Sequence, residues 1–234
     1  MDQRIPPEVL AAHRQTGDPA KLNLRMRLYP ESALDGMLDQ LVARPLAPGL
    51  LETVVLDTPQ HMSVLNRGQL EAREEDIFAA ALALSIGSEE HLVDTSQLSH
   101  GHVTFISGRH RYVGSHIHVL ARHFASVALP YGALVAFPLP EYVMIYPLGQ
   151  TGPVESLVDV QDVAQRLFDS GSKPLTKRIF WWIPGHYEQF LEPEALRSGL
   201  VPDLRPVGID IDGHAREIKL LTAETNDLFR ALGQ

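Results

Sequence analysis

The 234-residue chain contains no cysteine, and this absence removes several kinds of chemistry at once. Without cysteine there is no structural disulfide, no thiolate ligand for a metal ion and no thiol nucleophile. Such a composition fits a reducing compartment. Apolar residues make up 44% of the chain, which is enough for a buried core that needs neither a disulfide nor a metal ion to support it.

Long apolar runs are also missing. The N-terminus, Met1-Asp-Gln-Arg-Ile-Pro-Pro7, lacks the apolar core of a signal peptide. No run approaches the roughly 18 apolar residues that a membrane-spanning helix needs. We therefore expect a cytoplasmic protein that does not bind membranes.

Basic residues are outnumbered, since 29 acidic residues face 20 basic ones and the formal charge is −9. Nucleic-acid binding depends on clustered Lys and Arg, so we expect no nucleic-acid partner. Two local basic clusters exist, but neither combines with aromatic residues as in an RNA-binding sheet, and we interpret both as solvated faces. They consist of Lys21, Arg25 and Arg27, and of Arg109, Arg111 and Arg122.

The signature motifs of common enzymes are absent as well. The chain has no G-x-S-x-G nucleophile elbow, no G-x-x-x-x-G-K-[ST] phosphate loop and no G-x-G-x-x-G turn. Paired carboxylates occur at Glu74-Glu75-Asp76, Glu89-Glu90 and Asp210-x-Asp212, which we interpret as a helix N-terminus, a loop and the approach to a turn. We expect no cofactor and no catalytic residue among them.

Hydrophobic periodicity predicts an α+β fold with a mixed or antiparallel sheet, several hairpins and helices packed on one face. An opening β-α-β unit is expected from strands near 22–28 and 50–56 and a helix between Pro30 and Pro45. Further helices are predicted near 6–13, 71–86, 115–124, 153–168 and 223–232, and strands near 91–93 and 102–106. Hairpins are predicted at 133–146, at 177–190 around Pro184-Gly185, and at 207–220 around Asp212-Gly213.

Two parts are distinguished along the chain. Residues 1–192 are expected to form the α+β core domain. Residues 193–234 are expected to form a hairpin and helix extension that docks on the core. The sequence leaves the oligomeric state open.

Six of the eleven histidines lie between His100 and His123, and they include the triplets His100-Gly-His102 and His116-Ile-His118. Alternate residues of a strand share a face, so each triplet could supply two ligands to a metal ion. If His116 begins a helix, however, His116 and His118 lie about 200° apart around it and cannot chelate together. We therefore expect no metal site, with His100, His102, His116 and His118 as the alternative ligand set.

The adjacent pair Trp181-Trp182 lies in a predicted strand, where neighbouring side chains point to opposite faces. One indole could then lie in the core and the other at the surface, whereas packing beneath a neighbouring helix is the interpretation that we favour. An exposed Trp is a common anchor for a protein partner.

Four blocks after Leu70 resemble a bacterial family of uncharacterised cytoplasmic proteins, the YtpQ-like proteins, over about Leu70 to Phe190. The blocks are residues 71–83, 112–120, the hairpin 135–138 with 143–145, and 174–180 leading to Gly185 and Phe190. The resemblance implies an α+β fold. The chain departs from the family pattern at Leu84, Val113 and Leu139-Pro140-Glu141, so any function of those polar family positions is expected to be lost or altered here.

These observations favour a non-enzymatic protein-interaction module, such as an adaptor, a chaperone-like factor or an immunity-type inhibitor, with a protein partner. The expected anchors are basic and aromatic: Arg109, Arg111, Tyr112, Trp181 and Trp182. The alternative is a metal-dependent or small-molecule enzyme that uses the histidines between His100 and His123.

Overall fold

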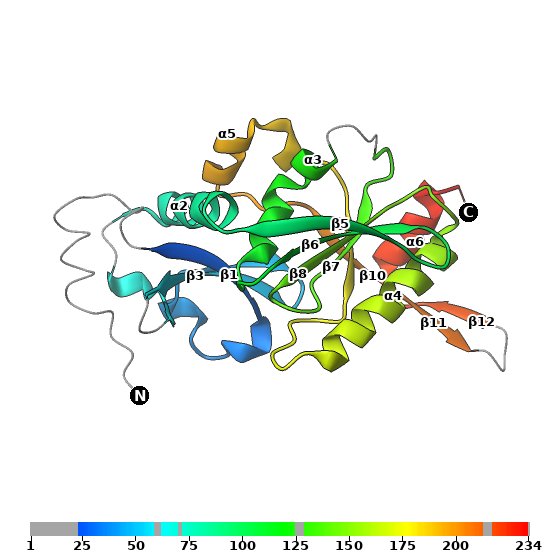
Figure 1. The fold of residues 1–234 in the computed structure, drawn as a ribbon, viewed down its shortest axis with the longest axis horizontal. Coiled ribbons are helices and arrows are strands. Elements are labelled where there is room, and N and C mark those ends of the chain that lie inside the picture. Colours follow the sequence, from blue (N-terminus) through cyan, green and yellow to red (C-terminus); the bar gives the residue numbers. More distant parts are fainter. Residues whose placement is uncertain (1–22, 59–61, 70–71, 125–128, 213–216, 234) are drawn as a thin grey trace.

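The computed structural model describes residues 23–58, 62–69, 72–124, 129–212 and 217–233, to which all structural statements below refer. Two antiparallel sheets, a separate two-stranded ribbon and the surrounding helices form an α+β fold, as the sequence predicts. Figure 1 shows an elongated molecule with the smaller sheet at one end and the C-terminal ribbon at the other. The helix expected near 6–13 and Lys21 of the first basic cluster lie outside the described residues.

The smaller sheet is built around β3 (Leu50–Asp57). One edge of β3 pairs with β1 (Leu24–Pro30), and the other edge pairs first with β2 (Ala43–Ala47) and then with β4 (Met62–Val64). All three pairings are antiparallel. The β2 strand was not predicted, because Pro45 within it lacks the N–H that a strand uses for pairing.

The helix predicted between Pro30 and Pro45 is wrong. The chain makes two short 3₁₀ turns there, Glu31–Ala33 and Leu38–Gln40. Between them Gly36 has a φ of +75°, a left-handed conformation that a right-handed helix cannot contain. The expected β-α-β unit is therefore an antiparallel β1–β3 pair instead.

The larger sheet has six strands in the order β10-β9-β7-β8-β6-β5, and every pairing is antiparallel. Its strands are β5 (His91–Gln97), β6 (His102–Gly108), β7 (Ala133–Ala136), β8 (Tyr142–Pro147), β9 (Ile179–Trp182) and β10 (Leu204–Val207). The predicted β7–β8 hairpin is confirmed. The hairpin predicted around Pro184-Gly185 is wrong, because both edges of β9 pair with strands distant in sequence and Tyr187–Gln189 is a 3₁₀ turn.

In the described part of the chain, five α-helices surround the sheets: α2 (Glu74–Gly87), α3 (Leu120–His123), α4 (Pro153–Ser170), α5 (Glu192–Arg197) and α6 (Ala223–Ala231). Three acidic residues in the first turn of α2 suit the positive end of the helix dipole, and Pro153 starts α4 at the position where proline is tolerated. The residues predicted to open a helix at 115 form a 3₁₀ segment, Val113–Val119, that leads into α3. None of the described helices is long and apolar enough to cross a membrane.

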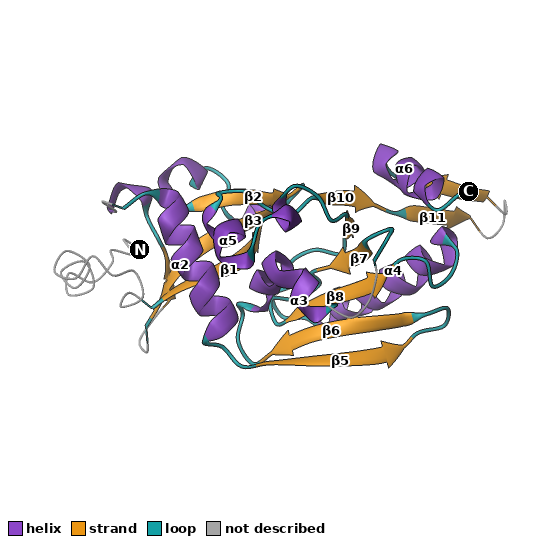
Figure 2. Cartoon of the chain, turned by 90° about the horizontal axis from the view of Figure 1, so that it is seen from above, coloured by secondary structure: helices purple, strands orange, loops and turns teal. Residues whose placement is uncertain are grey.

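The larger sheet is covered on both faces rather than on one (Figure 2). On one face, residues of β7, β8 and β9 pack with Leu157, Val160 and Ala164 of α4 and with Leu228 of α6. On the other face, the core continues through the 3₁₀ segment and α3 into the smaller sheet and α2. Because both faces of the sheet are covered, the side chains on either side of each strand are buried. This explains why the sequences of β7 and β8 are nearly continuous apolar runs.

The C-terminal residues are part of this architecture. The boundary expected after residue 192 falls inside α5, and β10 completes the larger sheet beside β9. Beyond it, β11 (Ile209–Asp212) and β12 (Glu217–Leu220) pair as the predicted ribbon, whose turn lies outside the described residues. The Thr222 hydroxyl caps α6 by accepting a hydrogen bond from the Thr225 N–H at 3.1 Å.

Candidate functional site

The two tryptophans expected to bind a partner are buried, with 5% of Trp181 and 2% of Trp182 exposed. They do point to opposite faces of β9, but helices and loops cover both faces. The Trp181 Nε1–H donates to the Tyr131 carbonyl at 2.8 Å, and the Trp182 Nε1–H donates to Glu188 Oε1 at 2.9 Å. The expectation of a surface indole at this pair is therefore corrected, since neither ring is available to a partner.

Tyr112 is also buried, and its hydroxyl donates to the Asp57 carboxylate at 2.6 Å. Burial, together with this hydrogen bond, raises the pKa of Tyr112. Of the five expected anchors only Arg109 and Arg111 reach the surface, and Arg111 lies 3.3 Å from Glu141. The five residues thus form no common surface patch.

The two basic clusters are largely neutralised within the fold. Arg25 pairs with Glu89 at 2.6 Å, and Arg27 is buried with its guanidinium 4.7 Å from the centre of the Tyr29 ring. Arg122 of the second cluster pairs with Glu192. These arginines contribute to internal contacts more than to a positively charged surface.

The four histidines of the alternative ligand set are not brought together. His100 is exposed, with its backbone N–H donating to Asp159 Oδ2 at 2.7 Å and its Nδ1 2.9 Å from Asp159 Oδ1. His102 is exposed two residues further on, where its backbone bonds to the Gln150 side chain. His116 and His118 are buried in two separate clusters. Among the described residues no group of three or more His, Asp or Glu side chains is arranged to hold a metal ion.

His116 is fully buried beside two other imidazoles. Its Nδ1 lies 3.2 Å from His123 Nε2, and its ring centre lies 4.1 Å from that of His91. Burial, and then the neighbouring His91 and His123, lower the pKa of His116 to about 3. Burial, with His91 and then Arg122 nearby, lowers the pKa of His123 to about 4. Both rings are therefore neutral at physiological pH.

His118 belongs to a second buried cluster, centred on Glu52 of β3. The His118 Nε2–H donates to the Glu52 carboxylate, and His118 Nδ1 lies 2.9 Å from the Tyr187 hydroxyl oxygen. Arg44 of β2 pairs with Glu52 at 2.7 Å and lies 4.3 Å above the ring of Phe78. Burial on its own raises the pKa of Glu52, but His118 and Arg44 outweigh it and lower the pKa to about 2.

A carboxylate, an imidazole and a hydroxyl in sequence form the arrangement that activates nucleophiles in hydrolases. A pocket of about 130 Å³ lies beside His118 and Tyr187. However, both ring nitrogens of His118 are engaged inside the protein, and burial, followed by the charge of Glu52, raises the pKa of Tyr187, which keeps the phenol protonated. The cluster therefore works as a polar connection between the smaller sheet and the loops of the larger one.

Sequence reasoning missed Glu52, Arg44 and Tyr187. Glu52 stands in the apolar run Leu50–Asp57, and a lone carboxylate in a buried strand is a signal that it needs a cationic partner. Nothing in the sequence indicates which of the twenty Lys and Arg residues or eleven His residues supplies it. The partner His118 lies 66 positions away and only the tertiary fold brings it there.

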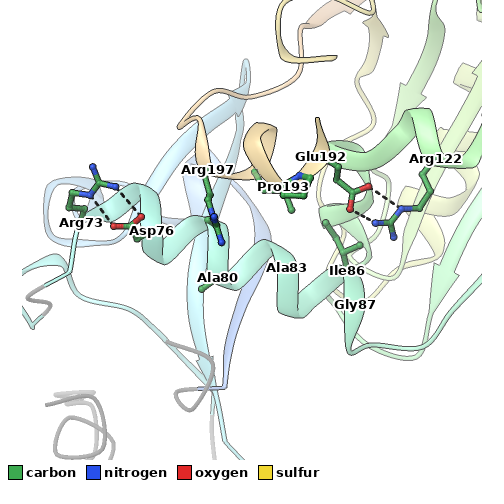
Figure 3. Close-up of a pocket in the computed structure, with 12 residues that line it drawn as sticks. Arg73, Asp76, Ala80, Ala83, Ile86, Gly87, Arg122, Glu192, Pro193 and Arg197 are labelled. Atoms are coloured by element: carbon green, nitrogen blue, oxygen red, sulfur yellow. Dashed lines mark hydrogen bonds and ion pairs between the residues drawn. The ribbon is translucent and has the colours of Figure 1, made fainter. Parts of the chain in front are cut away.

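A hollow with an apolar floor lies between α2 and α5 and has a volume of about 710 Å³ (Figure 3). We call it the α2–α5 groove. Its floor consists of small residues of α2, namely Ala79, Ala80, Ala83 and Gly87, next to Ile86. Pro193 and Leu196 of α5 form its opposite wall.

Charged side chains lie along the rim of the α2–α5 groove. At one end Arg73 holds Asp76 through two hydrogen bonds of 2.9 and 3.1 Å, and at the other end Arg122 holds Glu192. Between these pairs Figure 3 shows Arg197 reaching from α5 towards α2, where its charge adds to the hydrogen bond from Arg73 in lowering the pKa of Asp76. The groove therefore combines an apolar floor with a positive charge, Arg197, that lies between the two ion pairs.

A second hollow of about 730 Å³ lies between α4, β10 and the β11–β12 ribbon. Its polar lining is already used within the fold, since the Gln161 amide makes two hydrogen bonds to the Ile209 backbone and Thr222 caps α6. Its two cations, Lys177 and Arg178, are exposed. This hollow offers less specific chemistry than the α2–α5 groove.

Comparison of the chain with protein-family models, with curated proteins and with solved structures finds no match.

Proposed function

We propose that the protein is a non-enzymatic protein-binding module whose α2–α5 groove receives an amphipathic helix of a partner protein. The observation that carries this proposal is the alanine floor of the groove on a helix that is apolar on almost every side. Docking of a helix into an apolar groove is a recurring mode of peptide recognition.

The composition of α2 supports a covered outer face. A surface helix ordinarily carries polar residues on the side that faces water, whereas a helix that is apolar all round is normally buried. The inner face of α2, including Ile77, Phe78 and Leu82, packs in the core below. Its outer residues Ala80 and Ala83 would lie in contact with water unless a partner covers them.

The dimensions and side chains of the groove suit a helix. With 14 residues at about 1.5 Å each, α2 offers a contact line of roughly 20 Å, or nearly four turns of a partner helix. Alanine and glycine on the floor let two helix axes approach to about 8 Å, the short end of the usual range.

The positive charge on the rim of the groove indicates which charged residues the partner helix carries. Arg73 and Arg122 each hold a carboxylate by hydrogen bonds, whereas Arg197 acts through its charge on Asp76, which Arg73 already holds. A carboxylate on the incoming helix would pair with Arg197 beside the apolar floor, where water is partly excluded. We therefore expect an amphipathic helix with a small apolar face flanked by Asp or Glu.

The test is a selection from a displayed library of amphipathic helical peptides, with the full-length chain as the target. Selected peptides are expected to carry an acidic residue beside their apolar face. Their affinity, measured by fluorescence anisotropy, is expected to fall at least tenfold in Ala83→Trp, which fills the groove, and in Arg197→Glu, which reverses its charge. Ala83 is exposed, so the larger side chain does not disturb the core.

Two matched variants on α4 serve as controls. Arg166→Glu makes the same charge reversal at an exposed residue, and Gln165→Trp adds the same ring at a half-exposed residue, both on α4 and outside the groove. They are expected to leave peptide affinity unchanged. The proposal is wrong if the selected peptides bind Ala83→Trp and Arg197→Glu as well as they bind the control variants.

The second candidate function is an enzyme that uses the histidines between His100 and His123. One observation favours it, namely the hydrogen-bonded chain from Glu52 through His118 to Tyr187 beside a small pocket. This candidate predicts about one equivalent of metal in the protein purified without an affinity tag, and loss of that metal in the double variant His116→Ala, His118→Ala. If elemental analysis finds no metal in the wild-type chain, the hypothesis of a metal-dependent enzyme is wrong.

A further inference from the structure

The strand β5 forms an open edge of the larger sheet (Figure 2). It pairs with β6 through seven consecutive residues, from His91↔Gly108 to Gln97↔His102, without a bulge. Five of its seven residues are exposed, among them Leu92 at 73% and Val93 at 49%. The opposite edge strand, β10, lies beside β2 of the smaller sheet, so the open edge of the larger sheet is at β5.

Natural sheets protect an open edge, because its free N–H and C=O groups can pair with another chain. The usual devices are a proline, a lysine, a bulge or a covering segment. β5 contains neither proline nor lysine and carries one charged side chain, Asp94; its pairing with β6 is regular, and no described strand pairs with its outer side. Two adjacent apolar residues on such an edge indicate that it is covered in the working protein.

The hydrogen bonds of β6 establish which residues of β5 offer their backbone groups to a new strand. Gly108 and His102 of β6 bond away from β5, to the Glu141 carbonyl and to the Gln150 side chain, whereas the Leu98 N–H donates to Gly101 at the end of the β5–β6 pair. In an antiparallel pair, residues whose backbone groups bond to the partner strand alternate with residues whose backbone groups point away from it. The outward backbone groups of β5 therefore belong to His91, Val93, Thr95 and Gln97.

We propose that β5 pairs antiparallel with β5 of a second copy of this chain, with the two-fold axis at Val93. Only residues with outward backbone groups can form the hydrogen-bonded pairs, so the axis must pass through a residue rather than between two. An axis at Asp94 places two carboxylates directly opposite each other, and an axis at Leu92 places Glu90 opposite Asp94. An axis at Val93 opposes no like charges.

The Val93 register also brings the exposed apolar side chains together. Val93 lies opposite its own copy on one face of the joined sheet, and the two Leu92 side chains become diagonal neighbours on the other face. An axis at Thr95 also avoids like charges but separates the two valines by four residues. The pairs His91–Thr95, Val93–Val93 and Thr95–His91 supply two backbone hydrogen bonds each, which makes six across the interface.

The first test is the mass of the full-length chain in solution, by sedimentation equilibrium. The expected result is a dimer, with twice the chain mass of 25.9 kDa. Val93→Lys places two ammonium groups opposite each other and is expected to weaken the dimer at least tenfold. Met37→Lys changes another exposed apolar residue, 46% exposed, and is expected to leave the mass unchanged.

The second test fixes the register and uses the absence of cysteine from the chain. In Val93→Cys the two thiols lie on opposed residues about 5.5 Å apart between Cα atoms, within reach of a disulfide. In Thr95→Cys the two thiols lie four residues apart along the strands, about 13 Å, which is beyond reach. Mild oxidation is therefore expected to cross-link Val93→Cys and not Thr95→Cys.

The two tests distinguish an error in the proposed pairing from an error in its register. A monomer at 100 µM, or a dimer that Val93→Lys leaves intact, overturns the pairing through β5. Cross-linking of Thr95→Cys in place of Val93→Cys overturns the proposed register. Assemblies larger than a dimer contradict a closed two-fold contact, because such a contact uses up the open β5 edge that the described residues leave on each larger sheet.

Discussion

At the scale of single residues, Glu52 is the buried charge around which a set of polar contacts between the two sheets is built. It is fully buried in the central strand of the smaller sheet, and its carboxylate is held by Arg44 from β2 and by His118 from the 3₁₀ segment. A charge at this depth is tolerated because both of its oxygens are paired. The same cluster fixes the smaller sheet against the loop that carries Tyr187.

Glu52→Gln is expected to destabilise the chain by about 3–5 kcal/mol, because it leaves the buried His118 and the partly buried Arg44 without their counter-charge. The measurement is urea unfolding at pH 7. Glu141→Gln makes the same chemical change at the exposed pair with Arg111 and is expected to cost at most about 1 kcal/mol. Equal losses in the two variants would contradict the role assigned to Glu52.

The same residue predicts a pH dependence of stability. The pKa of Glu52 is about 2 in the folded chain and 4.5 as its ordinary value, so the folded state favours the ionised carboxylate. Its contribution is complete above about pH 4.5 and is lost as the pH falls towards 2. On the order of 3 kcal/mol of unfolding free energy is involved. Glu52→Gln is expected to show a shallower acid loss in this window, and an unchanged slope would refute the assignment.

At the scale of elements, backbone conformation decides where turns and strands lie. Gly132 precedes β7 with a φ of +74°, and a Cβ atom there would lie 2.0 Å from the Trp182 carbonyl oxygen of the neighbouring strand. Gly36 has a similar φ of +75°, but a Cβ atom there would meet nothing within 4 Å. The two glycines therefore separate the effect of backbone strain from that of close packing.

Gly36→Ala is expected to cost about 1 kcal/mol, the penalty of the left-handed conformation alone. Gly132→Ala is expected to cost about 2 kcal/mol more, because the β7–β9 pairing must also shift. Unfolding free energies from denaturant titration check the difference. Equal costs would show that the close approach of Gly132 to β9 is relieved without strain.

Patterns within single elements were predicted where the chain itself supplies the signal. The acidic first turn and terminal glycine of α2, the proline at the start of α4 and the apolar runs of β7 and β8 are local features, and these elements are confirmed. Helical spacing of leucines in 34–41 was misleading, because Gly36 interrupts the helix. β2 was missed, since Pro45 argues against a strand and only pairing with β3 overrides it.

At the scale of the whole molecule, the C-terminal residues complete the core. Leu196 and Leu204 join the core that includes α2 and the smaller sheet, and Val207, Ile209 and Leu228 join the core beneath α4. The extension expected from residue 193 onwards therefore contributes to both sides of the larger sheet. Without β10, the β9 strand that carries both tryptophans would become an edge.

A chain ended after residue 192 is consequently expected to unfold at a lower urea concentration and to show red-shifted tryptophan emission. The physical reason is that Trp181 and Trp182 lose the strand opposite them, where Arg205 and Leu204 pair with them. Fluorescence spectra of the full and the shortened chain check this. Identical emission and identical unfolding midpoints would show that the segment docks on an already complete core.

Composition and local patterning by themselves determined the α+β class, the cysteine-free chemistry, the helices α2, α4 and α6 and two of the three predicted hairpins, because these follow from the nature and periodicity of nearby residues. The tertiary structure alone decided that Tyr112, Trp181 and Trp182 are buried, that His116 and His118 belong to different clusters, and that Glu52 meets His118. Such contacts join residues far apart in sequence, as the 66 positions between Glu52 and His118 illustrate. Periodicity assigns a side chain to a face, but only the packing of other elements decides whether that face is covered.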